Sequence, residues 1–151
     1  GTLAAGAFMM PLIGGIAVGS ISPAVIFAAT FISALAFTAG PAFNEQLDIE
    51  EDRKYGIKSL AVVLSWKAKM EMVIIFVLAL MTLTPLTYAQ LELNVIFPIV
   101  VVAVCLLVLR YLIPLLSVFE DANFRRARNA LWALPVLVSM ALILGSLQFV
   151  F

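Results

Sequence analysis

Asp48 and Asp52 stand four residues apart in a charged stretch of an otherwise apolar chain. On a helix, side chains at this spacing share a face and lie about one turn from each other. Two carboxylates there repel each other unless a cation lies between them. Hard oxygen ligands suit Mg²⁺, which completes its shell with water and substrate phosphates. Zinc is a poor fit to a sequence with no histidine and one cysteine. The aspartate pair therefore predicts a magnesium site.

Two more polar residues belong to the same predicted helical face. Asn44 and Glu45 precede Asp48 by four and three residues, which brings both side chains within reach of it. Gly56 is placed to end this helix, because glycine adopts the left-handed conformation that often closes a helix. The chain can then turn back and bring Lys58 towards the carboxylates. We expect a short helix and the turn after it to form the site.

Basic residues next to the aspartates indicate an anion-binding site. They are Arg53, Lys54 and Lys58. Carboxylates holding Mg²⁺ beside such cations, at the mouth of a membrane cavity, suit a diphosphate with an apolar tail. Metal and cations would stabilise the departing diphosphate, and apolar helices would hold the tail and exclude water. The alternative is a solvated charged loop, because the D-x-x-x-D pattern alone is weak.

The composition identifies an integral membrane protein. Hydrophobic residues make up 64% of the chain and charged residues 12%, against about 45–50% and about 25% in soluble domains. The formal net charge is zero, so no global basic field points to nucleic acid. Cys105 lies inside an apolar run and is expected to be a small packing residue.

Apolar runs predict an all-α, multi-pass transmembrane helical bundle, since about 20 residues cross a hydrocarbon core of about 30 Å as a helix. The five predicted helices cover about 3–19, 23–43, 70–89, 95–116 and 130–150. Threading them alternately places the charged loops 44–69 and 117–129 on one face, with all nine Lys and Arg residues. The positive-inside rule makes this face of the cell membrane cytoplasmic.

The string D-I-E-E-D-R-K-Y-G-I-K-S-L-A-V-V-L resembles the second aspartate-rich motif of the UbiA superfamily of membrane prenyltransferases. In that family the pattern is D-x-x-x-D, a basic residue, then G-x-K-[ST]-L. The matching residues here are Asp48, Asp52, Arg53, Gly56, Lys58, Ser59 and Leu60. The resemblance implies that Asp48 and Asp52 bind Mg²⁺ and the prenyl diphosphate, and that Arg53 and Lys58 contact the diphosphate.

The resemblance also implies a fold. Residues 1–151 would be the C-terminal part of a single nine-helix domain, its helices five to nine. The family's first motif, N-D-x-x-D-x-x-x-D, is absent from this sequence, which begins without methionine. We therefore expect a fragment that needs N-terminal helices carrying that motif. The implied reaction is Mg²⁺-assisted loss of diphosphate, which leaves an allylic cation for a lipophilic acceptor to attack.

Two acceptors stay open. The glycine-rich run 14–19 looks like the helix before this motif in archaeal enzymes that prenylate geranylgeranylglyceryl phosphate for ether lipids. Asn44, in Gly-Pro-Ala-Phe-Asn-Glu, instead looks like aromatic prenyltransferases of quinone or chlorophyll synthesis. An alternative of another class is a non-catalytic transporter or scaffold. Transporters commonly place ionisable residues near the midplane and contain repeats, whereas these carboxylates lie at a predicted helix end and no repeat is visible.

Overall fold

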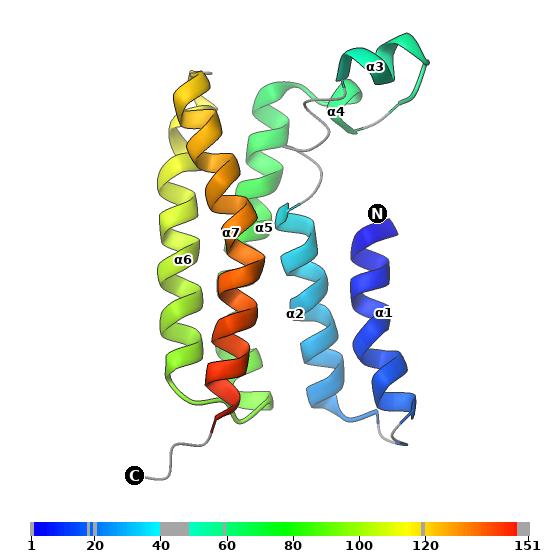
Figure 1. Cartoon of the computed structure of the whole chain (residues 1–151), viewed down its shortest axis with the longest axis vertical. Helices are drawn as coiled ribbons and strands as arrows, with labels where there is room; N and C mark the ends of the chain where they lie inside the picture. Colours follow the sequence, from blue (N-terminus) through cyan, green and yellow to red (C-terminus); the bar gives the residue numbers. More distant parts are fainter. Residues whose placement is uncertain are drawn as a thin grey trace.

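The chain folds as a bundle of helices in the computed structural model, which describes residues 2–17, 19, 21–39, 49–58, 60–118 and 120–147 (Figure 1). No strand occurs among these residues. The elements in chain order are α1 (Thr2–Ala17), α2 (Pro23–Ala39), α3 (Ile49–Lys54), α4 (Leu60–Val63), α5 (Trp66–Gln90), α6 (Ile96–Leu112), the 3₁₀ helix η1 (Ile113–Leu116) and α7 (Asp121–Ser146).

Three of these elements are long and apolar enough to cross a membrane. They are α5 with 25 residues, α6 continued by η1 with 21, and α7 with 26. The apolar helices α1 and α2 have 16 and 17 residues, fewer than the about 20 that a straight span needs. The helices α1, α2, α5, α6 and α7 run nearly parallel or antiparallel to one another. α1 lies at the edge of the bundle beside α2 (Figure 1). The predicted all-α membrane bundle is confirmed.

The start of α7 differs from the expected one. The helix begins at Asp121 rather than at residue 130, so most of the predicted charged loop 117–129 is helical. Phe124, Ala127 and Leu131 recur at spacings of three and four residues and are buried, which gives these extra turns an apolar face to pack. Asp121 lies in the first turn, where a negative charge suits the helix dipole. This segment is amphipathic, with charged residues on its outer face. A prediction based on wholly apolar runs therefore does not include it.

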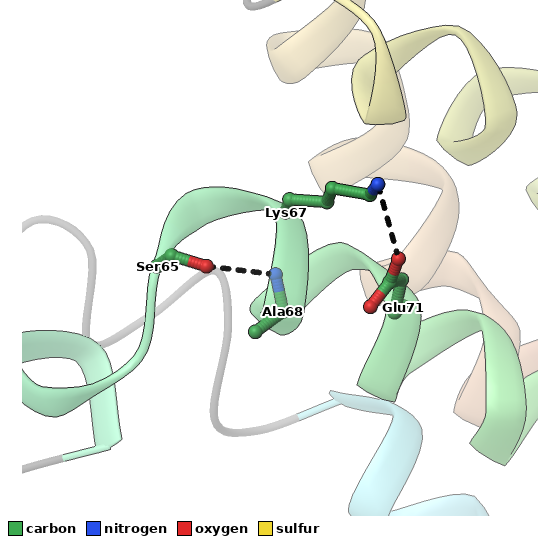
Figure 2. A network of polar contacts seen from close by, with 4 residues as sticks. All are labelled: Ser65, Lys67, Ala68 and Glu71. Carbon is green, nitrogen blue, oxygen red and sulfur yellow. Dashed lines mark hydrogen bonds and ion pairs between the residues drawn. The ribbon is translucent and has the colours of Figure 1, made fainter.

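α5 also begins earlier than the expected residue 70, at Trp66. Ser65 is the N-cap, and its Oγ accepts a hydrogen bond of 3.3 Å from the Ala68 backbone N–H. Lys67 then pairs with Glu71 one turn later, with 3.8 Å between Nζ and Oε1 (Figure 2). The serine cap satisfies one of the amide groups that a helix start leaves without a partner.

The core lies between α5, α6 and α7. Phe97, Val101, Cys105 and Val108 form one stripe along α6, and all four are fully buried. Their spacing of three or four residues is that of one helix face. Phe31 of α2 joins them, with its ring centroid 5.5 Å from that of Phe97. The expectation that Cys105 is a packing residue is confirmed.

The turn between α5 and α6 is tied to the end of α7. The Asn94 backbone N–H donates to the Gly145 carbonyl oxygen at 2.7 Å, and its Nδ2 donates to the carbonyls of Leu144 and Leu147 at 2.8 and 2.9 Å. A Cβ on Gly145 would lie 2.8 Å from the Cβ of Phe97. These contacts hold α6 and α7 in close register.

Basic residues gather at one end of the bundle. Figure 1 shows α3, α4, the start of α5, the end of α6 and the start of α7 together at this end. These parts and the turn between α3 and α4 carry all nine Lys and Arg residues: Arg53, Lys54, Lys58, Lys67, Lys69, Arg110, Arg125, Arg126 and Arg128. Among the described residues the opposite end carries one charged residue, Glu92, in the turn after α5. Charge is therefore segregated along the bundle axis.

Candidate functional site

The short helix α3 is closed by a C-cap built on Gly56. This glycine has φ of +68°. The Ile57 N–H donates to the Asp52 carbonyl oxygen at 2.8 Å, and the Gly56 N–H donates to that of Arg53 at 3.3 Å. This pair of bonds is the Schellman motif, which needs a left-handed residue that glycine adopts without steric cost. The prediction that Gly56 ends the helix is confirmed.

Asp52 lies in the last turn of α3 and is half-buried, whereas Glu51 beside it is exposed. The Asp52 carbonyl oxygen is held by the cap, so the backbone that carries its carboxylate is fixed on the C-terminal side. A helix C-terminus already bears partial negative charge. An ionised carboxylate added there makes this corner of the molecule attractive to a cation.

The predicted basic residues follow within a few positions of this carboxylate. Arg53 and Lys54 occupy the last turn of α3, where positive side chains suit the helix dipole. The Lys54 Nζ lies 5.8 Å from the ring centroid of Tyr55. Lys58 comes directly after the capped turn, and all three basic residues are exposed. Within the described part of the chain, neither Asp52 nor these cations take part in an ion pair.

Three predicted site residues lie outside the described residues: Asn44, Glu45 and Asp48. The structure thus places Asp52, Arg53 and Lys54 on α3 and Lys58 in the turn after it. The pairing of Asp52 with Asp48 stays a prediction. Among residues that are described, no three Asp, Glu, His or Cys side chains converge as a metal-binding group. The donor chemistry of the motif still fits Mg²⁺, because its side-chain ligands are carboxylates and the sole cysteine is buried in the core.

The start of α5, which follows the motif in the chain, packs against η1 and α7. Trp66 donates from Nε1 to the Leu115 carbonyl oxygen at 2.9 Å, and its ring lies 5.8 Å from that of Phe124. These contacts join α5 to η1 and α7. Lys69 in the same turn is 4% exposed. The sequence gives no signal for this burial, because it depends on the helices that pack around α5.

Comparison with known protein families identifies a match over most of the chain. The family model described as the UbiA prenyltransferase family matches residues 2–134, a stretch that runs from α1 into α7 and includes the whole charged motif. No curated protein and no solved structure matches the chain.

Proposed function

The chain belongs to the UbiA prenyltransferase family, and from this premise we propose that it moves a polyprenyl group from a prenyl diphosphate to a lipophilic acceptor with the help of Mg²⁺. Family membership and the apolar helices make it an intramembrane prenyltransferase in general terms. The observation that supports the finer proposal is the placement of Asp52, half-buried in the last turn of α3 at the basic end of the bundle.

Each charged residue of the motif has a role in this proposal. Asp48 and Asp52 hold the metal, which when bound stabilises negative charge on the departing diphosphate. Arg53, Lys54 and Lys58 bind and orient the phosphate oxygens, because charge-assisted hydrogen bonds are the strong ones. Asn44 and Glu45 complete the substrate site. The apolar helices hold the tail and keep water from the reactive carbon.

Two acceptors remain in the proposal. The glycine-rich run 14–19, whose first residues lie near the end of α1, favours geranylgeranylglyceryl phosphate and a role in archaeal ether-lipid synthesis. Asn44 favours an aromatic ring of quinone or chlorophyll synthesis. In either case the motif end of the bundle faces the cytoplasm by the positive-inside rule, and helices N-terminal to this chain supply the first aspartate-rich motif.

The test uses membranes from cells that express the open reading frame containing this chain. They receive labelled geranylgeranyl diphosphate, Mg²⁺, and either geranylgeranylglyceryl phosphate or 4-hydroxybenzoate. Label on the glycerol lipid identifies an ether-lipid enzyme, and label on the aromatic acid a quinone-pathway enzyme. Chelation by EDTA should abolish transfer, and Mg²⁺ should restore it. Intact protein that transfers label to neither acceptor, or that is indifferent to EDTA, contradicts the proposal.

A further inference from the structure

The outer face of α6 is left uncovered by the rest of the described bundle. α6 packs against α5 and α7, and in Figure 1 it stands at the edge of the bundle away from α3. Ile99 is 61% exposed and Leu106 55%, and Ala103 and Arg110 are exposed as well. Since α6 and η1 together are long and apolar enough to cross a membrane, this face meets the bilayer unless another segment covers it.

A shallow groove of about 440 Å³ runs along this face, which is within the usual range of ligand pockets, about 300–1,000 Å³. Side chains four residues apart form rows on a helix surface, with a groove between neighbouring rows. The lining residues belong to two such rows, and all of them are apolar: Pro98, Val102 and Leu106 in one, Ile99 and Ala103 in the other. The small side chain of Ala103 keeps the second row low, so the groove can accept a hydrocarbon chain.

Arg110 continues the first of these rows. It follows Leu106 by four residues, so its side chain lies one turn beyond the groove on the same face. Among the described residues it takes part in no ion pair. It lies about 10 Å along the axis from Leu116, where the span ends. A cation at this depth is costly unless it reaches the phosphate groups of the interface, and arginine binds phosphate through paired hydrogen bonds.

The spacing of charge and groove fits one phospholipid. Pro98, at the far end of the groove, lies about 18 Å along the axis from Arg110. One leaflet of a hydrocarbon core is about 15 Å deep, half of the usual thickness of about 30 Å. A lipid whose phosphate is bound by Arg110 can therefore lay one acyl chain along the whole groove. The other basic residues lie at the same end of the bundle and add to the attraction for a headgroup of net negative charge.

We propose that the outer face of α6 is a binding site for an anionic phospholipid, with the phosphate at Arg110 and one acyl chain in the groove between Leu106 and Pro98. The lipid belongs to the leaflet on the side of the charged motif. This site goes beyond the proposed function, and it is separate from α3, which lies on the other side of the bundle (Figure 1).

The experiment measures phospholipid binding by the full-length protein in a neutral detergent. Phosphatidylglycerol or phosphatidylcholine with the same acyl chains is titrated in, and the rise of the thermal midpoint gives an apparent dissociation constant. Arg110→Gln removes the charge, and Ala103→Phe fills the groove. The matched controls are Arg126→Gln and Ala133→Phe on α7. All four positions are exposed, so each variant should fold as the unaltered protein does.

The unaltered protein should bind phosphatidylglycerol about tenfold or more tightly than phosphatidylcholine. Arg110→Gln should weaken phosphatidylglycerol binding by about tenfold, the scale of one hydrogen bond to a charged group, and should remove most of this preference. Ala103→Phe should weaken the binding of both lipids by about fivefold or more, because its ring occupies the space of the acyl chain. The two controls should change each constant by less than about twofold, as expected for exposed surface positions.

Three outcomes overturn the inference. In the first, a folded Arg110→Gln variant keeps the phosphatidylglycerol constant of the unaltered protein. In the second, Arg126→Gln weakens binding as much as Arg110→Gln, which indicates a general surface attraction. In the third, Ala103→Phe leaves both constants unchanged, as it would if another helix or a second copy of the chain covered the groove. Prenyl transfer does not enter the measurement, so a failure of the proposed function would leave these results interpretable.

Discussion

The indole N–H of Trp66 donates a hydrogen bond of 2.9 Å to the carbonyl oxygen of Leu115, 49 residues later in the chain. Leu115 lies in η1, which begins where Pro114 tightens the end of α6. Carbonyl groups at a helix end lack partners within the helix, and the indole supplies one here. This bond fixes the first turn of α5, which follows the charged motif, against η1 at the end of α6.

Trp66→Phe should lower the free energy of unfolding by about 1 kcal/mol, the usual net contribution of one hydrogen bond. Phenylalanine keeps a ring beside Phe124 but cannot donate to Leu115. Denaturant unfolding in detergent measures the change. Trp132→Phe is the control, because Trp132 is 62% exposed on α7. Equal effects of the two substitutions would show that the hydrogen bond contributes nothing.

Gly56→Ala should reduce prenyl transfer through the shape of the motif. An alanine at φ of +68° costs about 1–2 kcal/mol, and the Schellman bonds that hold the end of α3 would weaken. Gly19→Ala imposes similar strain at φ of +76° in the turn between α1 and α2, and neither glycine has a neighbour within 4 Å of an added Cβ. Transfer assays on both variants should show a loss for Gly56→Ala alone. Equal transfer activities of the Gly56→Ala and Gly19→Ala variants would show that the C-cap of α3 does not contribute to prenyl transfer.

Gly145→Ala should destabilise the bundle by about 1–3 kcal/mol, the usual range for overpacking a tight contact. Its Cβ would lie 2.8 Å from that of Phe97, so α6 and α7 would have to separate. Gly14→Ala has open space around it on α1 and should stabilise that helix by up to about 1 kcal/mol. Thermal unfolding in detergent compares the two. An unchanged thermal stability of Gly145→Ala would mean that α6 and α7 can move apart at little energetic cost.

Variants with one introduced cysteine test the orientation. Cys105 is fully buried and should not react, so Lys58→Cys and Val95→Cys can be made in the native background. Both positions are exposed, at opposite ends of the bundle. A membrane-impermeant maleimide applied to intact cells should label the Val95→Cys variant, and label the Lys58→Cys variant only after permeabilisation. The reverse pattern would contradict a cytoplasmic motif.

Periodicity and composition predict most of the fold, because uninterrupted apolar runs report membrane helices directly. They fail where charge and burial coexist. The first turns of α7 carry arginines on one face and Phe124, Ala127 and Leu131 on the other, so a search for apolar runs passes over them. The same reason applies to the start of α5, since Lys67 and Lys69 precede the apolar run that begins at Met70.

The site is predictable to a different extent. Gly56 follows from turn chemistry, since few other residues adopt its backbone conformation readily, and the structure confirms it. Arg53, Lys54 and Lys58 are local to the motif and could be read from it. The burial of Lys69 could not be predicted from the sequence, because it depends on the helices that pack around this residue. The pairing of Asp48 with Asp52 stays a prediction.

The most direct measurement compares Asp52→Asn with Glu51→Gln in the transfer assay. The two residues are adjacent on α3, but Asp52 is half-buried at the cap and Glu51 is exposed. Asp52→Asn should lower kcat/KM on the order of 100-fold, the scale of losing one main electrostatic contact to developing charge, while the protein stays folded in the membrane. Glu51→Gln should leave it nearly unchanged. A folded Asp52→Asn variant with full Mg²⁺-dependent transfer would contradict the account.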